Sequence, residues 1–242
     1  MTARDVLVGV LRNEGAEVAA HKAIRREQHE AEGIERLSAE YLTLATEAQG
    51  ERWDALLARS GLSDDDLASV AASAARGPLF AGLRDAEARG LDVDAALPRL
   101  VAGRSLADAA DVASVLHGRV DRWSQAAGGR RRPNGQLIAG LIPRVQGVTD
   151  PDMARALSER DRAMEQRALS LAEEAVSARH SWVRPLGAPP KGPAQRERWL
   201  REVSTVAAYR DRWHIKGQRP LGVAPDRENH EQTAQRLSLI HI

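Results

Sequence analysis

The sequence predicts an all-α protein in which long helical arms flank a small helical bundle, followed by a tryptophan-containing helical segment toward the C-terminus. Of the 242 residues, 43% are hydrophobic but only 3% are aromatic, and alanine and leucine supply most of the apolar side chains. These residue types favour helix over strand. Apolar residues also recur every three or four positions, as on one face of a helix. The charged content of 29% indicates a globular chain.

Residues 1–50 are expected to form N-terminal helices. Thr2 lies three residues before Asp5, which places a capping hydroxyl before a carboxylate, and an apolar stripe follows. A longer helix is expected over residues 17–49, with a bend at Gly33. Its apolar stripe is narrow, so we expect this arm to dock on a neighbouring surface. The stripe consists of Ala20, Ile24, Ala31, Ile34, Leu37, Tyr41, Leu44 and Ala48.

Residues 51–125 are expected to form a compact bundle of short helices joined by tight turns. Serine, aspartate, glycine and proline recur at the spacings that start and stop helices. The acidic residues 64–66 suit a helix start, because they lie at the positive end of the helix dipole. The predicted boundary signals are Ser60, Gly61, Ser63, Gly77, Pro78, Gly90 and Ser105, and Pro98 is expected to kink or shorten the fourth helix.

Residues 126–149 are expected to form a linker of glycine, arginine and proline, followed by a short apolar segment. The composition of residues 128–135 indicates a flexible boundary. Arg130, Arg131 and Arg132 are candidate phosphate contacts, because each arginine could neutralise one phosphate of a nucleic acid. A solvated linker is the favoured alternative, since no aromatic side chain lies between the arginines for base stacking.

Residues 150–219 are expected to form a C-terminal helical region. Asp150 before Pro151 predicts a helix start, and a second narrow apolar seam continues to residue 178. Trp182 lies in a turn rich in proline and glycine. A further helix is expected over residues 193–215, and core packing of its apolar face is favoured over partner docking. That face carries Trp199, Val203, Val206 and Trp213.

Residues 220–242 are expected to form a polar tail that frays. The last six, residues 237–242, are apolar and differ from the rest of the tail. They resemble the translation of a sequencing adapter, so we interpret them as an artefact. The alternative is an apolar tail that docks on the bundle.

The sequence indicates no catalytic, cofactor or metal site. It contains no phosphate loop, dinucleotide-binding turn, zinc-protease helix or serine-hydrolase elbow, and it has no cysteine. His29 and Glu32 share a predicted helix face but lack a third metal ligand, so a solvated face is favoured. Residues 64–66 are expected to cap a helix rather than to bind Mg²⁺. His117 is expected to be a helix C-cap or a core histidine rather than a general base.

Charge and hydropathy exclude a strong general attraction to nucleic acid or membrane. Lysine and arginine number 35 against 34 acidic residues, so the formal net charge is +1. No apolar run approaches the roughly 18 residues of a membrane span, which predicts no membrane insertion. The lack of cysteine fits a reducing compartment, and we expect a cytoplasmic protein.

Several stretches, taken in order, resemble one region of a known family. They are ARDVL at 3–7 with GAE at 15–17 and His21, RLVA at 99–102 with VLHGRV at 115–120, and LIAGLIP at 137–143 with WVRPLG at 182–187 and TVAAYRDR at 205–212. Over residues 1–236 the chain resembles the region C-terminal to the helicase in actinobacterial MobF-type (TrwC-like) conjugative relaxases. The order of the segments carries this resemblance, and no catalytic motif contributes to it.

The resemblance implies a non-catalytic accessory region of a larger relaxase–helicase. Members of the family have a relaxase domain that nicks plasmid DNA with a tyrosine and a three-histidine metal site, and a RecD-like helicase. Tyr41 and Tyr209 lie in no such context, so no catalytic residue is transferred. The implied partners are the relaxase and helicase domains of the same parent protein, the coupling protein of a type IV secretion system, and DNA. Met1 is accordingly expected to be internal to a longer reading frame.

Two alternatives remain open. In the first, the chain is a free-standing helical scaffold that self-associates through the seams at residues 20–48 and 157–178. In the second, it is a small DNA-binding module that acts through Arg130, Arg131 and Arg132.

Overall fold

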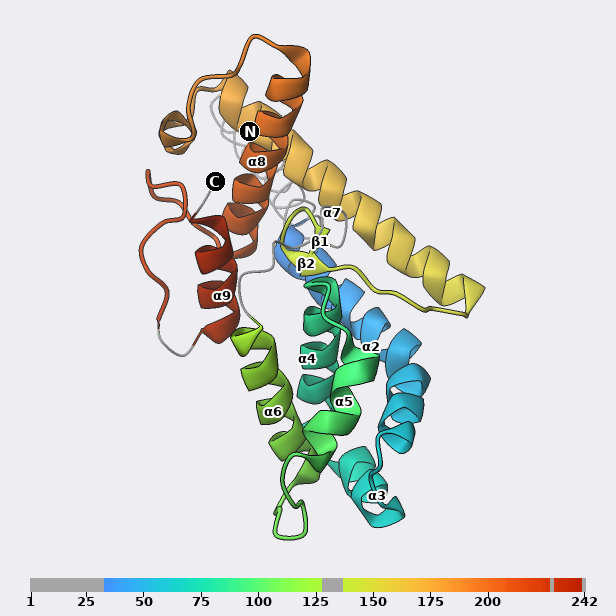
Figure 1. The fold of residues 1–242 in the computed structure, drawn as a ribbon. Coiled ribbons are helices and arrows are strands. Elements are labelled where there is room, and N and C mark those ends of the chain that lie inside the picture. The colour runs from blue at the N-terminus through green and yellow to red at the C-terminus, as the bar shows by residue number, and fades with distance from the viewer. Residues whose placement is uncertain (1–32, 128–136, 227–228, 241–242) are drawn as a thin grey trace, which may run out of the picture.

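The computed structural model describes residues 33–127, 137–226 and 229–240, and these form the predicted all-α fold. The helices gather in two groups, one above the other in Figure 1, and α2 extends through both. Within the residues described, no helix combines the length and the hydropathy needed to cross a membrane. In chain order the elements are α2 (Ile34–Arg59), α3 (Asp64–Ala72), α4 (Arg76–Ala88), α5 (Val93–Ala102), α6 (Val112–Ala126), β1 (Leu137–Ile138), β2 (Ile142–Pro143), α7 (Pro151–Ser177), the 3₁₀ helix η1 (Ser181–Leu186), α8 (Pro193–Arg212) and α9 (His230–Leu239).

Helix α2 passes without interruption through Gly50, where the sequence analysis separates an arm from the first bundle helix. That expected helix boundary is corrected. The buried residues Tyr41, Ala45, Gln49 and Trp53 follow one another at steps of four, so one face of α2 contacts the core along its length. A single glycine costs a helix only about 1 kcal/mol, which this packing offsets.

The first half of α2 docks on the chain's own C-terminal helices. The helix begins after its N-cap Gly33, whose backbone is extended (φ −64°, ψ 144°). A bend at Gly33 within a longer helix stays a prediction, because the residues before Gly33 lie outside the described part of the chain. Ile34 and Tyr41 are buried in a core that they share with residues of α7 and α8. The docking expected for the arm is therefore confirmed for its described part, and residues 17–32 lie outside the described residues.

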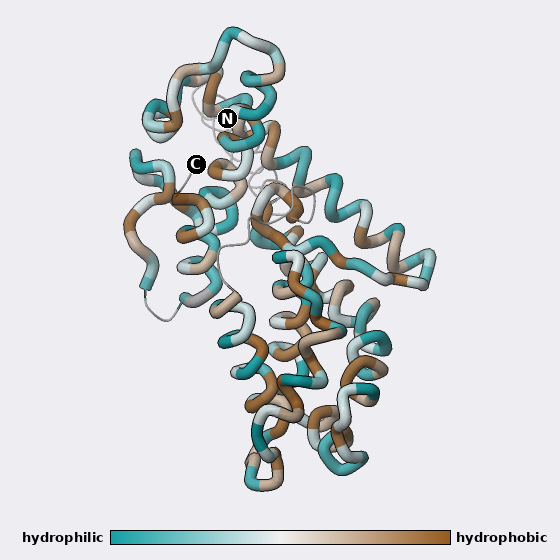
Figure 2. The backbone as a smooth tube through the Cα atoms, in the orientation of Figure 1, coloured by the Kyte–Doolittle hydropathy of each residue, from teal (hydrophilic) through white to brown (hydrophobic). Residues whose placement is uncertain are grey.

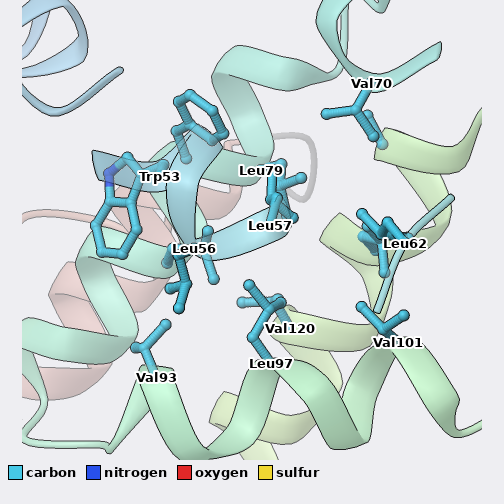
Figure 3. Packing of buried hydrophobic residues seen from close by; sticks show 14 of the residues in the cluster. Trp53, Leu56, Leu57, Leu62, Val70, Leu79, Val93, Leu97, Val101 and Val120 are labelled. Carbon is cyan, nitrogen blue, oxygen red and sulfur yellow. The ribbon is translucent and has the colours of Figure 1, made fainter. Parts of the chain in front are cut away.

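The lower group is the predicted small bundle. Its core combines Trp53 and Leu57 from α2, Leu79 from α4, Leu97 from α5 and Val120 from α6, each at most 1% exposed (Figure 3). Hydrophobic and hydrophilic residues alternate along its helices, as Figure 2 shows. Burying side chains of this size contributes roughly 1.5–3 kcal/mol each, so these contacts hold the bundle together.

Most helix boundaries in this bundle agree with the sequence signals. Ser63 accepts a hydrogen bond from the Asp66 N–H while Asp66 accepts one from the Ser63 N–H, so the acidic run caps α3 as predicted. Gly90 follows the end of α4 with φ +78°, and Pro98 lies inside α5. The glycine supplies the left-handed backbone that commonly ends a helix.

The last bundle helix begins after Asp111, so the start predicted at Ser105 is wrong. The Asp111 carboxylate accepts hydrogen bonds from the Ser114 N–H at 3.2 Å and from Ser73 Oγ at 2.9 Å. Asp111 therefore caps α6 and also fixes it to the turn between α3 and α4. Ser105 accepts a hydrogen bond only from the Ala107 N–H, two residues ahead, within a turn. Sequence spacing alone does not reveal the contact with Ser73, which decides between the two caps.

The apolar segment before α7 forms a hairpin that the sequence analysis did not predict. Strands β1 and β2 pair antiparallel, with Leu137 opposite Pro143 and Ile138 opposite Ile142. Ala139 and Gly140 turn the chain with φ of 48° and 73°. Ile138 and Ile142 are buried in the core between α2, α7 and α8. Two residues per strand are too few for periodicity to predict the pairing.

The upper group holds a further core around two tryptophans. Trp182 and Trp199 are 6% and 7% exposed, and they pack with Val203 and Val206 of α8 and with small residues of α7. Trp199 Nε1 donates a hydrogen bond to the Leu186 carbonyl at 2.9 Å, which fixes η1 on α8. The expected core packing of Trp199 is confirmed.

Trp213 does not share this core, which corrects its predicted place beside Trp199. Helix α8 ends at Arg212, so Trp213 follows as its C-cap and packs on the core around Tyr41 and Met164 instead. Its Nε1 donates to Gln235 Oε1 at 2.9 Å.

The expected fraying of the tail is wrong for residues 230–239, which form α9. Asn229 caps this helix by accepting from the Gln232 N–H at 3.0 Å. Arg212 pairs with Glu231 at 2.7 Å, and Leu239 is only 4% exposed. These contacts tie a mostly polar helix to α8. Leu239 also falls in the segment interpreted as an artefact, and its burial supports the docked alternative for that residue.

Candidate functional site

Two sequence-based candidates lie outside the described residues. They are the phosphate contacts Arg130, Arg131 and Arg132 and the pair His29 and Glu32. Both remain predictions.

The other candidates have structural positions. In the described part of the chain, no group of three or more histidine, aspartate or glutamate side chains is arranged to hold a metal ion. His117 lies in the middle of α6, so the C-cap interpretation is wrong. A β-carbon placed at Gly82 of α4 would lie 3.4 Å from His117 Cδ2, and the ring is therefore packed between the two helices.

A pocket of about 570 Å³ opens between α7, η1, the end of α8 and residues 214–217. Its apolar lining comes from the core around Trp182 and Trp199 and from the loop after α8. Charged and imidazole side chains also line it. The apolar residues are Leu171, Ala175, Trp182, Ala207 and Ile215, and the others are Glu174, His180, Arg210, Asp211, His214 and Lys216.

Arg210 holds the loop that forms one wall of this pocket. Its Nη1 donates to the carbonyls of Arg219 at 2.6 Å and Pro220 at 3.0 Å, and its Nη2 donates to those of Ile215 at 3.0 Å and Gly217 at 2.7 Å. Its guanidinium carbon lies 4.9 Å from the centre of the Trp182 ring. Burial lowers the pKa of Arg210 from its ordinary value, but arginine stays charged at physiological pH.

Asp211 joins α8 to the start of α2 and to α7. Its carboxylate accepts a hydrogen bond from the Ile34 N–H at 2.8 Å and pairs with Arg167 at 3.0 Å, with both side chains of the pair at most 15% exposed. His214 Nε2 lies 2.7 Å from Glu35 Oε2 at the surface beside it. The pocket wall is thus also the support for the N-terminus of α2.

These contacts decide what the pocket can do. Arg210 and Asp211 bind the loop and α2, whereas the lining residues Glu174, His180 and Lys216 are exposed. A pocket lined by apolar and charged side chains together suits binding of a small group or a side chain.

Arg210 has no predicted role in the sequence, although its spacing on α8 contains one signal. Arg210 lies four residues after Val206 and seven after Val203, so it occupies the buried face of α8. A charged residue on a buried face must be hydrogen-bonded or paired. The sequence therefore marks Arg210 as a structural arginine but does not indicate its partners.

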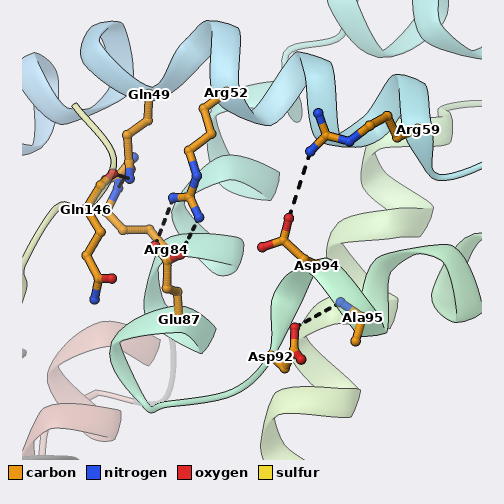
Figure 4. A network of polar contacts seen from close by, with 9 residues as sticks. All are labelled: Gln49, Arg52, Arg59, Arg84, Glu87, Asp92, Asp94, Ala95 and Gln146. Carbon is orange, nitrogen blue, oxygen red and sulfur yellow. Dashed lines mark hydrogen bonds and ion pairs between the residues drawn. The ribbon is translucent and has the colours of Figure 1, made fainter. Parts of the chain in front are cut away.

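A second buried cation, Arg84, lies between the two helical groups (Figure 4). Its Nε donates to Gln49 Oε1 at 3.0 Å, and Gln49 Nε2 donates to the Gln146 carbonyl at 2.8 Å. Burial lowers the pKa of Arg84. This network connects α4, α2 and the segment after the hairpin, so its hydrogen bonds hold these three parts of the fold together.

Comparison with protein-family models, with curated proteins and with solved structures finds no match to this chain.

Proposed function

We propose that this chain is a non-catalytic accessory region of a conjugative relaxase–helicase. It supports plasmid DNA processing and transfer by docking against the helicase or by recruiting the coupling protein of a type IV secretion system. Its nearest partners are the relaxase and helicase domains of the same parent protein, and it acts in the cytoplasm. The proposal rests on the ordered stretches that resemble the MobF-type family.

The packing of those stretches against one another is the observation that supports the proposal. A β-carbon at Gly140, in LIAGLIP, would lie 2.5 Å from the Thr205 side chain in TVAAYRDR. Arg210 of the same stretch lies over the ring of Trp182 in WVRPLG. Segments that are distant in the sequence and carry the resemblance thus form one junction, as expected of stretches that define a common fold.

The self-association alternative is disfavoured for the described parts of both seams. Ile34 and Tyr41 of the first seam share a core with Leu157 and Met164 of the second. Each seam therefore covers the other within one chain and does not offer an apolar face to a second copy. The DNA-binding module that would act through residues 130–132 remains an alternative outside the described residues.

The DNA upstream of the Met1 codon provides the first test. We expect the reading frame to continue upstream and to encode a helicase with a phosphate loop, as the resemblance implies. An in-frame stop codon upstream of the Met1 codon, with a promoter between the two, would contradict the proposal.

A binding experiment provides the second test. We expect the helicase part encoded upstream to bind this chain when the two are purified separately and mixed in isothermal titration calorimetry. A parallel titration with the coupling protein distinguishes docking from recruitment. If neither protein binds even at about millimolar concentration, the accessory role is contradicted, because a linker within one chain supplies an effective concentration of that order.

A further inference from the structure

One stretch of this nearly neutral chain carries only positive charge and is described throughout by the structure. Between Glu174 and Glu197 there is no acidic residue and there are four lysines or arginines. Because the whole chain has a net charge of +1, the remaining residues together carry −3. All four basic side chains are exposed, and they are Arg179, Arg184, Lys191 and Arg196.

The fold gathers these four residues at one end of the upper helical group. Helix α7 ends at Ser177, and the chain passes through η1 and a turn into α8, all at the top of Figure 1. Trp182 and Val183 of η1 are buried against α8, and the hydrogen bond from Trp199 to Leu186 fixes the end of η1. The backbone that carries the cations is therefore held in place by packing. We call these four residues the basic end.

Within the described residues, no carboxylate pairs with a side chain of the basic end. Glu197 pairs with Arg201 at 2.6 Å, away from Arg196. Elsewhere a half-buried arginine is neutralised by a carboxylate, as in the pair of Arg167 with Asp211. The N-terminus of α8 adds to the positive potential, because Gly192 provides no capping side chain for its first N–H groups.

We propose that the basic end binds the phosphate backbone of a nucleic acid without reading its base sequence. Four exposed cations that pair with no carboxylate in the described part of the chain suit a ligand with regularly repeated negative charges. Trp182 and Trp199 are buried and offer no surface for base stacking, so contacts are limited to the backbone. The charge distribution that supports this site is independent of the proposed accessory function.

The absence of apolar surface favours nucleic acid over a membrane or a protein partner. Among the described residues, the exposed large hydrophobic side chains are Leu169, Val223, Leu237 and Ile240, and none lies in the basic end. A membrane-binding surface needs an apolar face to enter the lipid. A protein interface needs an apolar centre.

The salt dependence of binding tests the site. Fluorescence anisotropy with a labelled DNA duplex, and separately with one of its strands, measures affinity over a series of salt concentrations. Four phosphate contacts predict that log K falls with log salt with a slope of about −3.6 for the duplex and about −2.8 for the single strand. Comparing the dissociation constants of the duplex and the single strand shows which form the protein prefers.

A charge-reversal variant and a matched control locate the binding. Arg184→Glu/Lys191→Glu/Arg196→Glu is expected to weaken duplex binding at least about 100-fold near 0.1 M salt and to reduce the slope to about −0.9. Arg179 is left unchanged because its φ of +54° makes its backbone sensitive to substitution. The control Arg99→Glu/Arg104→Glu/Arg162→Glu changes the net charge equally at exposed arginines elsewhere, and it should keep the original slope.

Four outcomes would overturn the proposal. The first two are an unchanged salt slope in the basic-end variant and an equal loss of DNA affinity in the control variant. The other two are loss of all DNA binding in Arg130→Gln/Arg131→Gln/Arg132→Gln alone, and binding of the protein to phosphatidylserine vesicles but not to DNA.

Circular dichroism checks that each variant is folded. If the glutamate variant is unfolded, Arg184→Gln/Lys191→Gln/Arg196→Gln replaces it. This variant must also reduce the slope of log K against log salt to about −0.9. A failed upstream-frame test leaves these results unaffected.

Discussion

Arg210 and Asp211 are neighbours in the sequence, yet they support different parts of the molecule. Arg210 donates to carbonyl groups of the loop after α8, and Asp211 accepts from the first N–H of α2. Successive residues on a helix point about 100° apart, so the last turn of α8 reaches both. Single polar side chains therefore fix the relative positions of α2, α7 and the loop.

Gly140 is the residue where a methyl group should be least tolerated. Its φ is +73°, and a β-carbon there would lie 2.5 Å from Thr205 Cγ2. We expect Gly140→Ala to lower the free energy of unfolding by about 3 kcal/mol, because backbone strain and overpacking add. Urea denaturation measures this.

Gly61 provides the matched control for Gly140. It has φ +90° but no atom within 4 Å of a β-carbon, so Gly61→Ala isolates the backbone strain. We expect a loss of about 1 kcal/mol there. Adding Thr205→Ala to Gly140→Ala should recover part of the stability. Equal losses at the two glycines would contradict the steric explanation.

Tyr41 predicts how stability depends on alkaline pH. The side chain is 2% exposed, and burial raises the pKa of its phenol above the ordinary value of 10.0. Above pH about 10 the unfolded chain loses this proton first, so the free energy of unfolding should fall as the pH rises, until the raised pKa is passed. Below that window the contribution of Tyr41 is constant.

Tyr41→Phe should remove this part of the alkaline slope. At neutral pH the variant should lose about 1 kcal/mol, because the Val145 N–H donates to the Tyr41 oxygen at 2.8 Å. Chemical denaturation between about pH 9 and about pH 11 compares the slopes of the two proteins. Parallel slopes would show that ionisation of Tyr41 is not linked to folding.

At the scale of elements, α9 shows how a polar helix is kept in place by few contacts. Leu239 is 4% exposed, whereas Leu237, two residues away, is 58% exposed. We expect Leu239→Ala to lower the free energy of unfolding by about 2–3 kcal/mol and Leu237→Ala to change it by less than about 0.5 kcal/mol. Thermal unfolding of the two variants measures the difference. Equal midpoints would mean that α9 does not dock in solution.

At the scale of the whole molecule, α2 is the element that both helical groups share. Its first half packs with Met164 and Tyr209 in the upper core, and its second half carries Trp53 and Leu57 into the lower bundle. The Gln49 network adds a polar contact where the groups meet. We therefore expect the described parts of the chain to unfold in a single transition.

Substitutions at Gly50 test this coupling. Proline in the middle of α2 removes a backbone hydrogen bond and clashes with the preceding turn, at a cost of about 3 kcal/mol or more. Gly50→Pro should separate thermal unfolding into two transitions. Gly50→Ala is the control, because its β-carbon would meet only Arg76 Nη2 at 3.8 Å, and it should stabilise by about 0.5–1 kcal/mol. A single transition in Gly50→Pro would show that α2 does not couple the groups.

The sequence by itself determined the helical class, most helix boundaries and the absence of the searched catalytic motifs. Local chemistry decides these features. Ser63 caps α3 through residues three positions away, and Asp150 caps α7 by accepting from the Asp152 and Met153 N–H groups. Such signals are contained in a few neighbouring residues.

Only the tertiary structure decided the hairpin, the cap at Asp111, the docking of α9 and the roles of Arg210 and Asp211. Each depends on a partner distant in the sequence, such as Ser73 for Asp111 or Ile34 for Asp211. The basic end depends on both levels, because the sequence contains its charges and the packing of Trp182 and Trp199 holds the backbone that carries them. Periodicity describes which face of a helix is apolar, and only the fold determines what that face contacts.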